Sequence, residues 1–399
     1  MACNIGANDV ANSMGTSVGS GTLTFKQAIL MAAVAEFAGA FFVGGHVSDT
    51  IRKGMLDPML FEANPMHLVY GMIAALVASA IWLHIASALG WPVSTTHSIV
   101  GAVVGFGLAA GGIEAINWSK VNQVVLSWVV SPAMGGLFSF LIFTLISRLI
   151  FNSRQPLYHV RQFLPYMTFV IFMILANSMV YKGLKNLRLD LSFPEALIIS
   201  LVAGAAAFVV AKALAARIEV DPTRPLKEQF VSTENIFKYL QMITAFYVAF
   251  AHGSNDVANA VGPLAAVVAT LKGGVVQTKV EMPAWILALG GGCIVFGLMV
   301  WGRKVMKTVG ERITEITPSR GFSAEFGAAT VVLICSKMGM PISTTHTLVG
   351  AVIGVGLARG LPTLNLKIVK MIVISWITTV PFTAAISMVF FKFLEHSLP

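Results

Sequence analysis

Long apolar runs broken by short polar stretches dominate the chain. Six runs are close to the length that spans a bilayer, at residues 68–89, 121–150, 163–180, 196–216, 286–301 and 368–393. About 20 apolar residues cross the hydrocarbon core as a helix, and a helix satisfies its own backbone polar groups there. The pattern therefore predicts an all-α polytopic membrane protein with about 10–12 membrane segments.

Composition strengthens this prediction. Of the 399 residues, 56% are hydrophobic and 11% are charged, whereas a soluble domain is about 25% charged. The chain has too few charges to cover a water-facing surface in the usual way. The net charge of +9 is typical of Lys and Arg in cytoplasmic loops of membrane proteins, so we expect a lipid bilayer and no nucleic acid among its partners.

The polar segments recur along the chain. Three pairs of segments match: 6–12 (GANDVAN) with 253–259 (GSNDVAN), 91–109 with 340–358, and 127–128 with 375–376. Their offsets are 247, 249 and 248 residues, and the second pair has 13 identities in 19 positions. A nearly constant offset predicts two copies of one unit.

We expect residues 1–150 to form a first transport repeat and residues 236–399 a second. Residues 151–235 would supply connecting spans and a polar connector at 217–235. Duplicated membrane chains are typical of secondary transporters, whose sites lie near the midplane where the repeats meet. The residues alone do not distinguish inverted from parallel copies.

The two NDVAN motifs place an acid and two amides in an apolar setting. Asp9 and Asp256 are costly in a bilayer, and such acids are functional by default. Because Asp and Asn favour helix breaks and caps, we expect each motif to interrupt its helix and expose carbonyl oxygens. An all-oxygen set of this kind suits a small hard cation. The plainer alternative, a helix cap at the membrane edge, needs only one residue.

The two STTH motifs predict hairpin tips. Ser94-Thr95-Thr96, the first tip, recurs as Ser343-Thr344-Thr345, the second tip, and each follows a Pro. The apolar segment after each tip is about a dozen residues long, which favours a re-entrant helix. Hydroxyls and unpaired N–H groups at a helix N-terminus attract phosphate. The alternative is a pair of ordinary N-caps, and we expect His97 and His346 to be packing residues.

Two glutamates, Glu36 and Glu325, lie within apolar runs but not at equivalent positions of the two copies. An ionisable group at membrane depth indicates function. Three roles remain open for them: carrying protons, completing a cation site or bracing a hairpin. Polar bonding between helices is the structural alternative.

The paired GANDVAN and GSNDVAN, VSDTIRKG at 47–54 and the doubled P-[VI]-STTH resemble the PiT family of inorganic phosphate transporters over essentially the whole chain. The resemblance implies symport of inorganic phosphate with sodium ions, or in some members with protons or as a metal–phosphate complex. It also implies an inverted-repeat transport domain and a homodimer.

The resemblance also implies roles for residues at the motif positions. Cation binding falls to Asp9, Asn12, Asp256 and Asn259, with Asp9 and Asp256 as the metal-ligating acids. Phosphate binding falls to Ser94, Thr95, Thr96, Ser343, Thr344, Thr345, Asn8 and Asn255. Glu36 and Glu325 match glutamates on which transport depends in this family. A half-helix, 237–251, precedes the second motif but only five residues precede Gly6, so we expect an N-terminal truncation.

We therefore predict a secondary active transporter of the plasma (inner) membrane, and not an enzyme. It would carry phosphate with Na⁺ by alternating access and need no cofactor besides Na⁺ or H⁺ as coupling ion. The rival functions are a passive anion channel and an intramembrane hydrolase that uses Ser94 or Ser343. The sequence has no GxSxG elbow to support the hydrolase and no Walker motif to support ATP-driven transport.

Overall fold

The computed structural model describes residues 1–44, 56, 58–180, 192–276, 282–337 and 342–398. Its α-helices are α1 (Ala2–Gly19), α2 (Phe25–Val43), α4 (Pro65–Leu89), α5 (Thr95–Gly111), α6 (Trp118–Ile146), α7 (Pro156–Ser178), α8 (Phe193–Ala216), α9 (Leu226–Gly273), α10 (Ala284–Trp301), α11 (Arg303–Lys307), α12 (Pro318–Lys337), α13 (Thr344–Ala358) and α14 (Leu366–Ser397). Short 3₁₀ turns, η2 (Pro58–Phe61), η3 (Ile113–Ala115) and η8 (Leu361–Thr363), and π turns, η4 (Ser147–Phe151) and η7 (Thr308–Arg312), join them. The VSDTIRKG segment at 47–54 lies outside the described residues.

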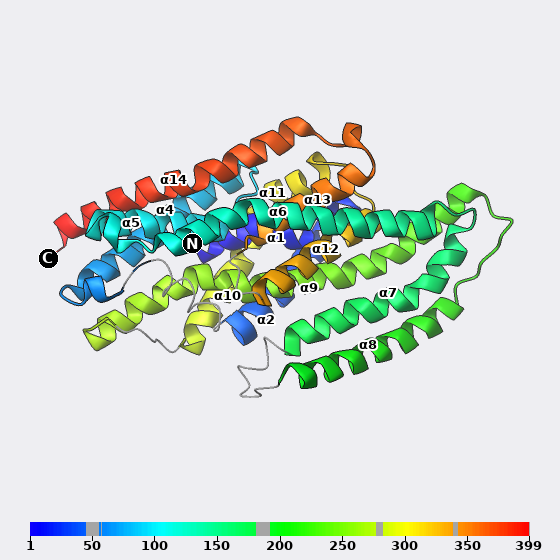
Figure 1. Cartoon of the computed structure of the whole chain (residues 1–399), viewed down its shortest axis with the longest axis horizontal. Coiled ribbons are helices and arrows are strands. Elements are labelled where there is room, and N and C mark those ends of the chain that lie inside the picture. Colours follow the sequence, from blue (N-terminus) through cyan, green and yellow to red (C-terminus); the bar gives the residue numbers. More distant parts are fainter. Residues whose placement is uncertain (45–55, 57, 181–191, 277–281, 338–341, 399) are drawn as a thin grey trace.

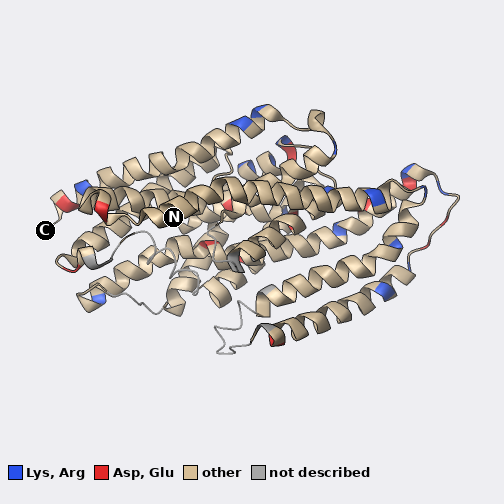
Figure 2. Cartoon of the chain, in the orientation of Figure 1, with Lys and Arg blue, Asp and Glu red and all other residues tan. Residues whose placement is uncertain are grey.

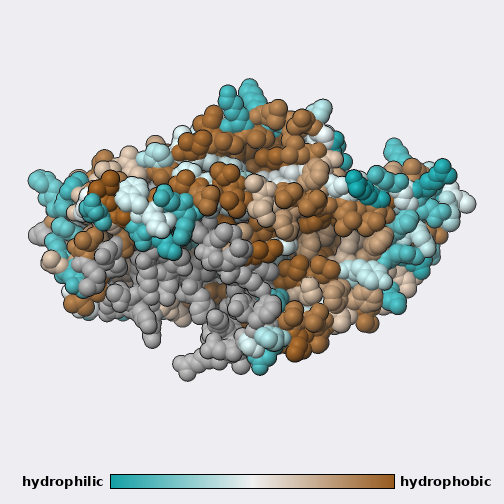
Figure 3. Space-filling view, in the orientation of Figure 1, coloured by the Kyte–Doolittle hydropathy of each residue, from teal (hydrophilic) through white to brown (hydrophobic). Residues whose placement is uncertain are grey.

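The fold is that of an all-α, multi-pass membrane protein, as predicted. Within the described residues, seven helices are long and apolar enough to cross a membrane: α2, α4, α6 with η4, α7, α8, α10 and α14. They cover all six of the predicted apolar runs. Most charged residues lie toward the two ends of the long axis (Figure 2), and hydrophobic side chains cover most of the surface between them (Figure 3).

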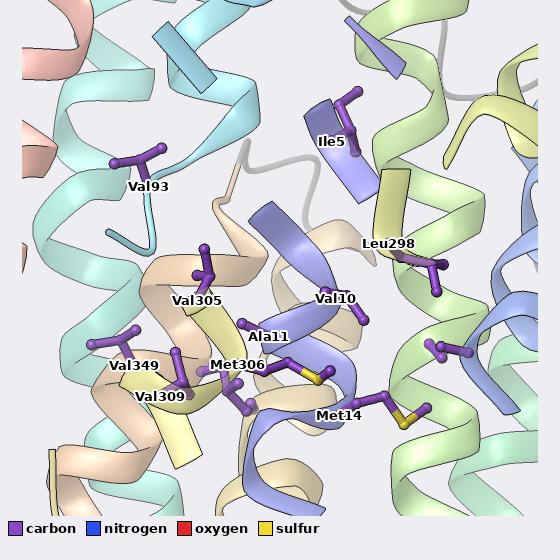
Figure 4. Close-up of a cluster of buried hydrophobic side chains, with 14 of the residues drawn as sticks. Ile5, Val10, Ala11, Met14, Val93, Leu298, Val305, Met306, Val309 and Val349 are labelled. Atoms are coloured by element: carbon purple, nitrogen blue, oxygen red, sulfur yellow. The ribbon is translucent and has the colours of Figure 1, made fainter. Parts of the chain in front are cut away.

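Helix α1 lies at the centre of the bundle (Figure 1). Every residue from Ile5 to Ser17 is buried. Its apolar side, with Val10 and Met14, packs against Leu298 of α10 and Met306 of α11 (Figure 4). Because lipid tails are as apolar as these side chains, close packing and polar bonds, rather than the hydrophobic effect, hold such helices together.

The two short helices pack on long helices that are distant in sequence. Helix α5 lies against α14, and α13 lies against α6. In each short helix the contact uses a GxxxG pair: a Cβ at Gly105 would lie 2.2 Å from the Ala384 carbonyl oxygen, and one at Gly354 would lie 2.0 Å from that of Gly136. These glycines let the backbones touch, so each short helix is fixed on its partner.

The predicted helix breaks at the NDVAN motifs are wrong. Helix α1 runs unbroken through Asn8–Asn12, and α9 runs unbroken through Asn255–Asn259 for 48 residues in all. The polar side chains find partners on neighbouring helices, described below, so the backbone keeps its own hydrogen bonds. The carbonyl ligands expected from a break are therefore not supplied.

The polar connector is shorter than predicted, because α9 already begins at Leu226. An exposed turn remains at 221–224. There the Thr223 hydroxyl donates a hydrogen bond of 2.6 Å to the Asp221 carboxylate and lowers the pKa of that carboxyl below its ordinary value.

The hairpin tips form as predicted. Helix α4 ends in a Schellman turn in which the Trp91 N–H donates to the Ala86 carbonyl at 2.8 Å, and Gly90 takes the left-handed conformation (φ 74°) that this turn requires. Ser94 then caps α5 and Ser343 caps α13, since each accepts a hydrogen bond of 3.2 Å from the backbone N–H three residues on. The Ser94 side chain is buried, so the first tip lies inside the protein.

The glycine contact between α13 and α6 can be tested with Gly354→Ala. The added methyl group meets backbone that cannot rotate away, and overpacking of this kind costs about 1–3 kcal/mol. We expect a lower melting temperature in detergent, followed by tryptophan fluorescence. Gly292→Ala in α10 is the matched control, because a Cβ there meets nothing within 4 Å. Equal melting temperatures for the two variants would contradict this account of the packing.

Candidate ion-binding site at the centre of the protein

Asp9 is the junction between the two hairpin tips. The Thr95 hydroxyl of the first tip donates to its Oδ2 at 2.8 Å, and the Thr345 hydroxyl of the second tip donates to its Oδ1 at 3.1 Å. Asp9 is completely buried. Segments that are more than three hundred residues apart in sequence therefore meet on one carboxylate.

The motif amides cross from one copy to the other. Asn12 Nδ2 donates to Thr345 Oγ1 of the second tip at 2.8 Å. Asn259 Nδ2 donates to Thr95 and Thr96 of the first tip at 3.3 and 3.2 Å. Each NDVAN motif thus holds the tip of the other copy, and neither half of the site is complete without the other.

The outer ends of the motifs differ in their contacts. Asn8 holds the backbone of the first tip: the Val93 N–H donates to its Oδ1 at 3.1 Å, and its Nδ2 donates to the Trp91 carbonyl at 2.9 Å. In the second motif Asp256 accepts a hydrogen bond of 2.9 Å from Thr344. Asn255 is partly exposed.

His252 completes the site, and our interpretation of the sequence missed it. Its Nε2 lies 3.2 Å from Asp9 Oδ2 and 3.0 Å from Asp256 Oδ2, and its Nδ1 lies 3.3 Å from Glu36 Oε2. The ring is buried. The available signal was its position four residues before Asp256, on the same face of a helix, whereas the equivalent position of the first copy holds apolar Ile5.

Glu36 belongs to the central site through this histidine. Its other oxygen, Oε1, accepts a hydrogen bond of 3.1 Å from Ser13, one turn beyond Asp9 on α1. Helix α2 therefore supplies a third buried carboxylate, which lies behind the imidazole rather than beside the tips.

The arrangement offers ligands for a cation. One donor atom from each of Asp9, His252 and Asp256 lies within 4.8 Å of the others. The buried Asn12 Oδ1 has no hydrogen-bond partner in the protein. Carboxylate, amide and hydroxyl oxygens suit Na⁺ or another hard cation, and the imidazole would also suit a transition-metal ion.

The tips offer donors for an anion beside these ligands. Within the first turn of α5 and of α13, the amides of Thr95, Thr96, Thr344 and Thr345 have no acceptor inside their own helix. Such amides and the positive end of the helix dipole attract phosphate. The side chains of Thr96 and Thr344 are partly exposed, so they can reach a ligand.

Glu325 lies apart from this centre, one to two turns farther along α1. Its carboxylate accepts hydrogen bonds from Thr16, Ser17 and Thr244 at 2.6, 2.8 and 2.6 Å, and from Gln241 Nε2 at 3.2 Å. It is fully buried, and all four donors are neutral. Glu325 therefore ties α12 to α1 and α9 without an ion pair in this network.

Comparison with known proteins identifies the family. The sequence model described as the phosphate transporter family matches residues 5–387. The chain belongs to the phosphate transporter family. This confirms the resemblance seen in the motifs, and places the chain among transporters rather than enzymes.

Relatives and a solved structure agree along nearly the whole chain. A protein of Arabidopsis thaliana named "Inorganic phosphate transporter 2-1, chloroplastic" is 44% identical over 98% of this chain and 70% of its own length. A Haemophilus influenzae relative is 45% identical over 99% of this chain and 94% of its own length. A solved structure titled "The sodium-dependent phosphate transporter" matches with a TM-score of 0.90 and 44% identity, over 100% of this chain and 97% of that one.

The structure thus gathers most of the predicted residues of this phosphate transporter family member. The acids and second amides of both NDVAN motifs, and the threonines of both tips, are in direct contact. Glu36 joins them through His252, Ser94 and Ser343 lie at the adjoining caps, and Asn8 braces the first tip. Glu325 lies in a separate network.

The Glu325 network predicts a stability effect. Glu325→Leu leaves buried donors without an acceptor, and each costs about 1–3 kcal/mol, so we expect a large fall in melting temperature in detergent. Glu325→Gln keeps the size and one acceptor oxygen and should cost less. Glu311→Leu is the control, since the Glu311 side chain is 49% exposed. A Glu325→Leu protein as stable as this control would show that the network contributes nothing.

Proposed function

We propose that this protein carries inorganic phosphate across the membrane in symport with a cation, with Na⁺ favoured, by alternating access. The observation that carries the proposal is the crosswise contact between the NDVAN motifs and the hairpin tips, which puts cation ligands and anion donors next to each other. The names of the relative and of the solved structure support both phosphate and sodium.

The residues divide between the two ligands by their chemistry. Asp9, Asn12, Asp256 and Asn259 offer oxygens for the cation. The hydroxyls and first-turn amides of both tips offer donors for the phosphate oxygens. Asn8 positions the first tip, and by its matching place in the motif we assign the same role to Asn255.

Electrostatics couples the two ligands. Two buried carboxylates repel an approaching anion: a unit charge 5 Å away costs about 3 kcal/mol at an effective dielectric constant of 20. A cation bound at Asp9 and Asp256 removes this repulsion. The affinity for phosphate therefore rises with cation occupancy, and by linkage the affinity for the cation rises equally with phosphate.

A second candidate, transport of a metal–phosphate complex, is favoured by His252. An imidazole between two carboxylates is a better ligand set for a transition-metal ion than for Na⁺. In that case the metal would be cargo, and removal of divalent ions would stop uptake.

The organisation of the chain completes the proposal. The contacts of α5 with α14 and of α13 with α6 support two interlocked copies at 1–150 and 236–399, which we take to be inverted around the central site. A homodimer and a location in the plasma membrane are part of the same proposal.

Proteoliposomes containing the purified protein provide the direct test. With an inward sodium gradient, labelled phosphate should accumulate above its external concentration, and choline in place of sodium should abolish the accumulation. Sodium and pH are varied independently, with and without EDTA. Accumulation driven by a pH gradient alone would indicate proton coupling, a need for divalent ions would indicate metal–phosphate transport, and mere equilibration would indicate a channel.

The cation site predicts the effect of Asp256→Ala. Removing this carboxylate should abolish sodium-driven uptake while the protein still inserts and folds, because Thr344 loses only one hydrogen bond. Asp221→Ala in the exposed connector is the matched control and should transport normally. Near-normal sodium-driven uptake by Asp256→Ala would contradict the assignment of the cation site.

A further inference from the structure

The histidines of the two STTH motifs meet face to edge behind the tips. The ring centroids of His97 and His346 are 4.6 Å apart, and the ring planes are 85° apart. Both side chains are at least 99% buried. The function proposed above does not use these rings.

Each ring also rests on a tryptophan of a long helix. His97 lies 5.1 Å from the Trp128 ring of α6, and His346 stacks on the Trp376 ring of α14 at 3.8 Å. Trp376 Nε1 in turn donates to the Pro92 carbonyl of the first tip at 3.0 Å. The same tryptophan therefore contacts the ring of one hairpin and the backbone of the other.

The rings are rigidly connected to the residues that bear the hydroxyls. The backbone N–H of each histidine donates to the capping serine of its own tip at 3.2 Å, so ring and tip belong to one helical turn. Besides the ring contact, the tips touch through the Thr345 hydroxyl, which donates to the Val93 carbonyl at 3.3 Å. A change in ring spacing must therefore change the spacing of the tips.

The ring contact depends on shape rather than on hydrogen bonds. His97 Nδ1 and both ring nitrogens of His346 have no hydrogen-bond partner in the protein. Edge-to-face rings at this separation attract each other weakly and have a preferred distance. They act as a spacer of fixed thickness between two helix N-termini.

We propose that His97 and His346 are positioning residues that set the distance between the two tips and thereby select the size of the oxyanion. This rests on the proposed function. A tetrahedral anion held from both sides needs donors at about 2.7–3.1 Å on each side. Arsenate has the shape and charge of phosphate but longer bonds to oxygen, so a fixed spacing favours phosphate, whereas a loosened one favours it less.

The test compares His97→Ala with His97→Phe in proteoliposomes of the full chain. Initial rates of labelled phosphate uptake give KM and Vmax, and competition by arsenate gives its inhibition constant. For His97→Ala we expect KM for phosphate to rise about tenfold, equivalent to the loss of 1.4 kcal/mol of binding. Vmax should stay within about threefold, and the preference for phosphate over arsenate should fall several-fold.

His97→Phe keeps a flat ring but has no titratable nitrogen, so it should restore KM and the preference toward the wild-type values. The double variant His97→Ala/His346→Ala should be no worse than either single variant, because both remove the same contact. His84→Ala is the matched control: this imidazole also packs edge-to-face on a tryptophan, Trp301, with centroids 5.7 Å apart, but away from the tips.

The outcomes separate the two proposals. Wild-type protein without phosphate uptake would overturn the proposed function itself. Wild-type uptake with an unchanged KM and arsenate preference in His97→Ala would overturn the spacer role alone. A His97→Phe protein that matches His97→Ala in KM, with a normal melting temperature, would do so too, and this comparison remains decisive if the alanine variant does not fold.

Discussion

A carboxylate in the middle of a membrane protein must find donors, and the structure is arranged around meeting this requirement at Asp9. The hydroxyls of Thr95 and Thr345 supply two of the donors, and the His252 ring lies within reach on a third side. Because these groups come from α5, α13 and α9, satisfying one buried acid forces three distant segments together. An unsatisfied charge there would cost several kcal/mol, so the contact constrains the whole fold.

The glycine contacts of the short helices follow from the same requirement. For both tips to reach Asp9, α5 and α13 must penetrate the bundle, and GxxxG pairs let them lie directly against α14 and α6. The edge-to-face histidines then limit how closely the tips approach. Oxygen-rich helices, donor-rich tips and an apolar spacer together define a space with ligands for both signs of charge.

The two copies do not contribute equally to this space. The second copy contributes His252 where the first has Ile5, and the first copy contributes Glu36, which lies on the far side of the imidazole. Asp9 contacts both tips, whereas among the described residues Asp256 contacts only its own. This asymmetry gives the acids different surroundings despite identical motifs, which a transporter that binds one anion between two similar halves requires.

The sequence by itself determined the membrane class, the repeated motifs, the serine-capped tips and most of the polar residues of the site. Such features are written in local composition and spacing, because an acid or a triplet of hydroxyls in an apolar run is costly unless it is used. Only the tertiary structure decided that the helices stay unbroken at NDVAN, that each motif holds the tip of the other copy, and that His252 joins Asp9 to Glu36 while Glu325 lies apart. These outcomes depend on which side chains meet across helices far apart in the chain, and whether a polar group breaks its helix or keeps it intact is settled by the partners it finds there.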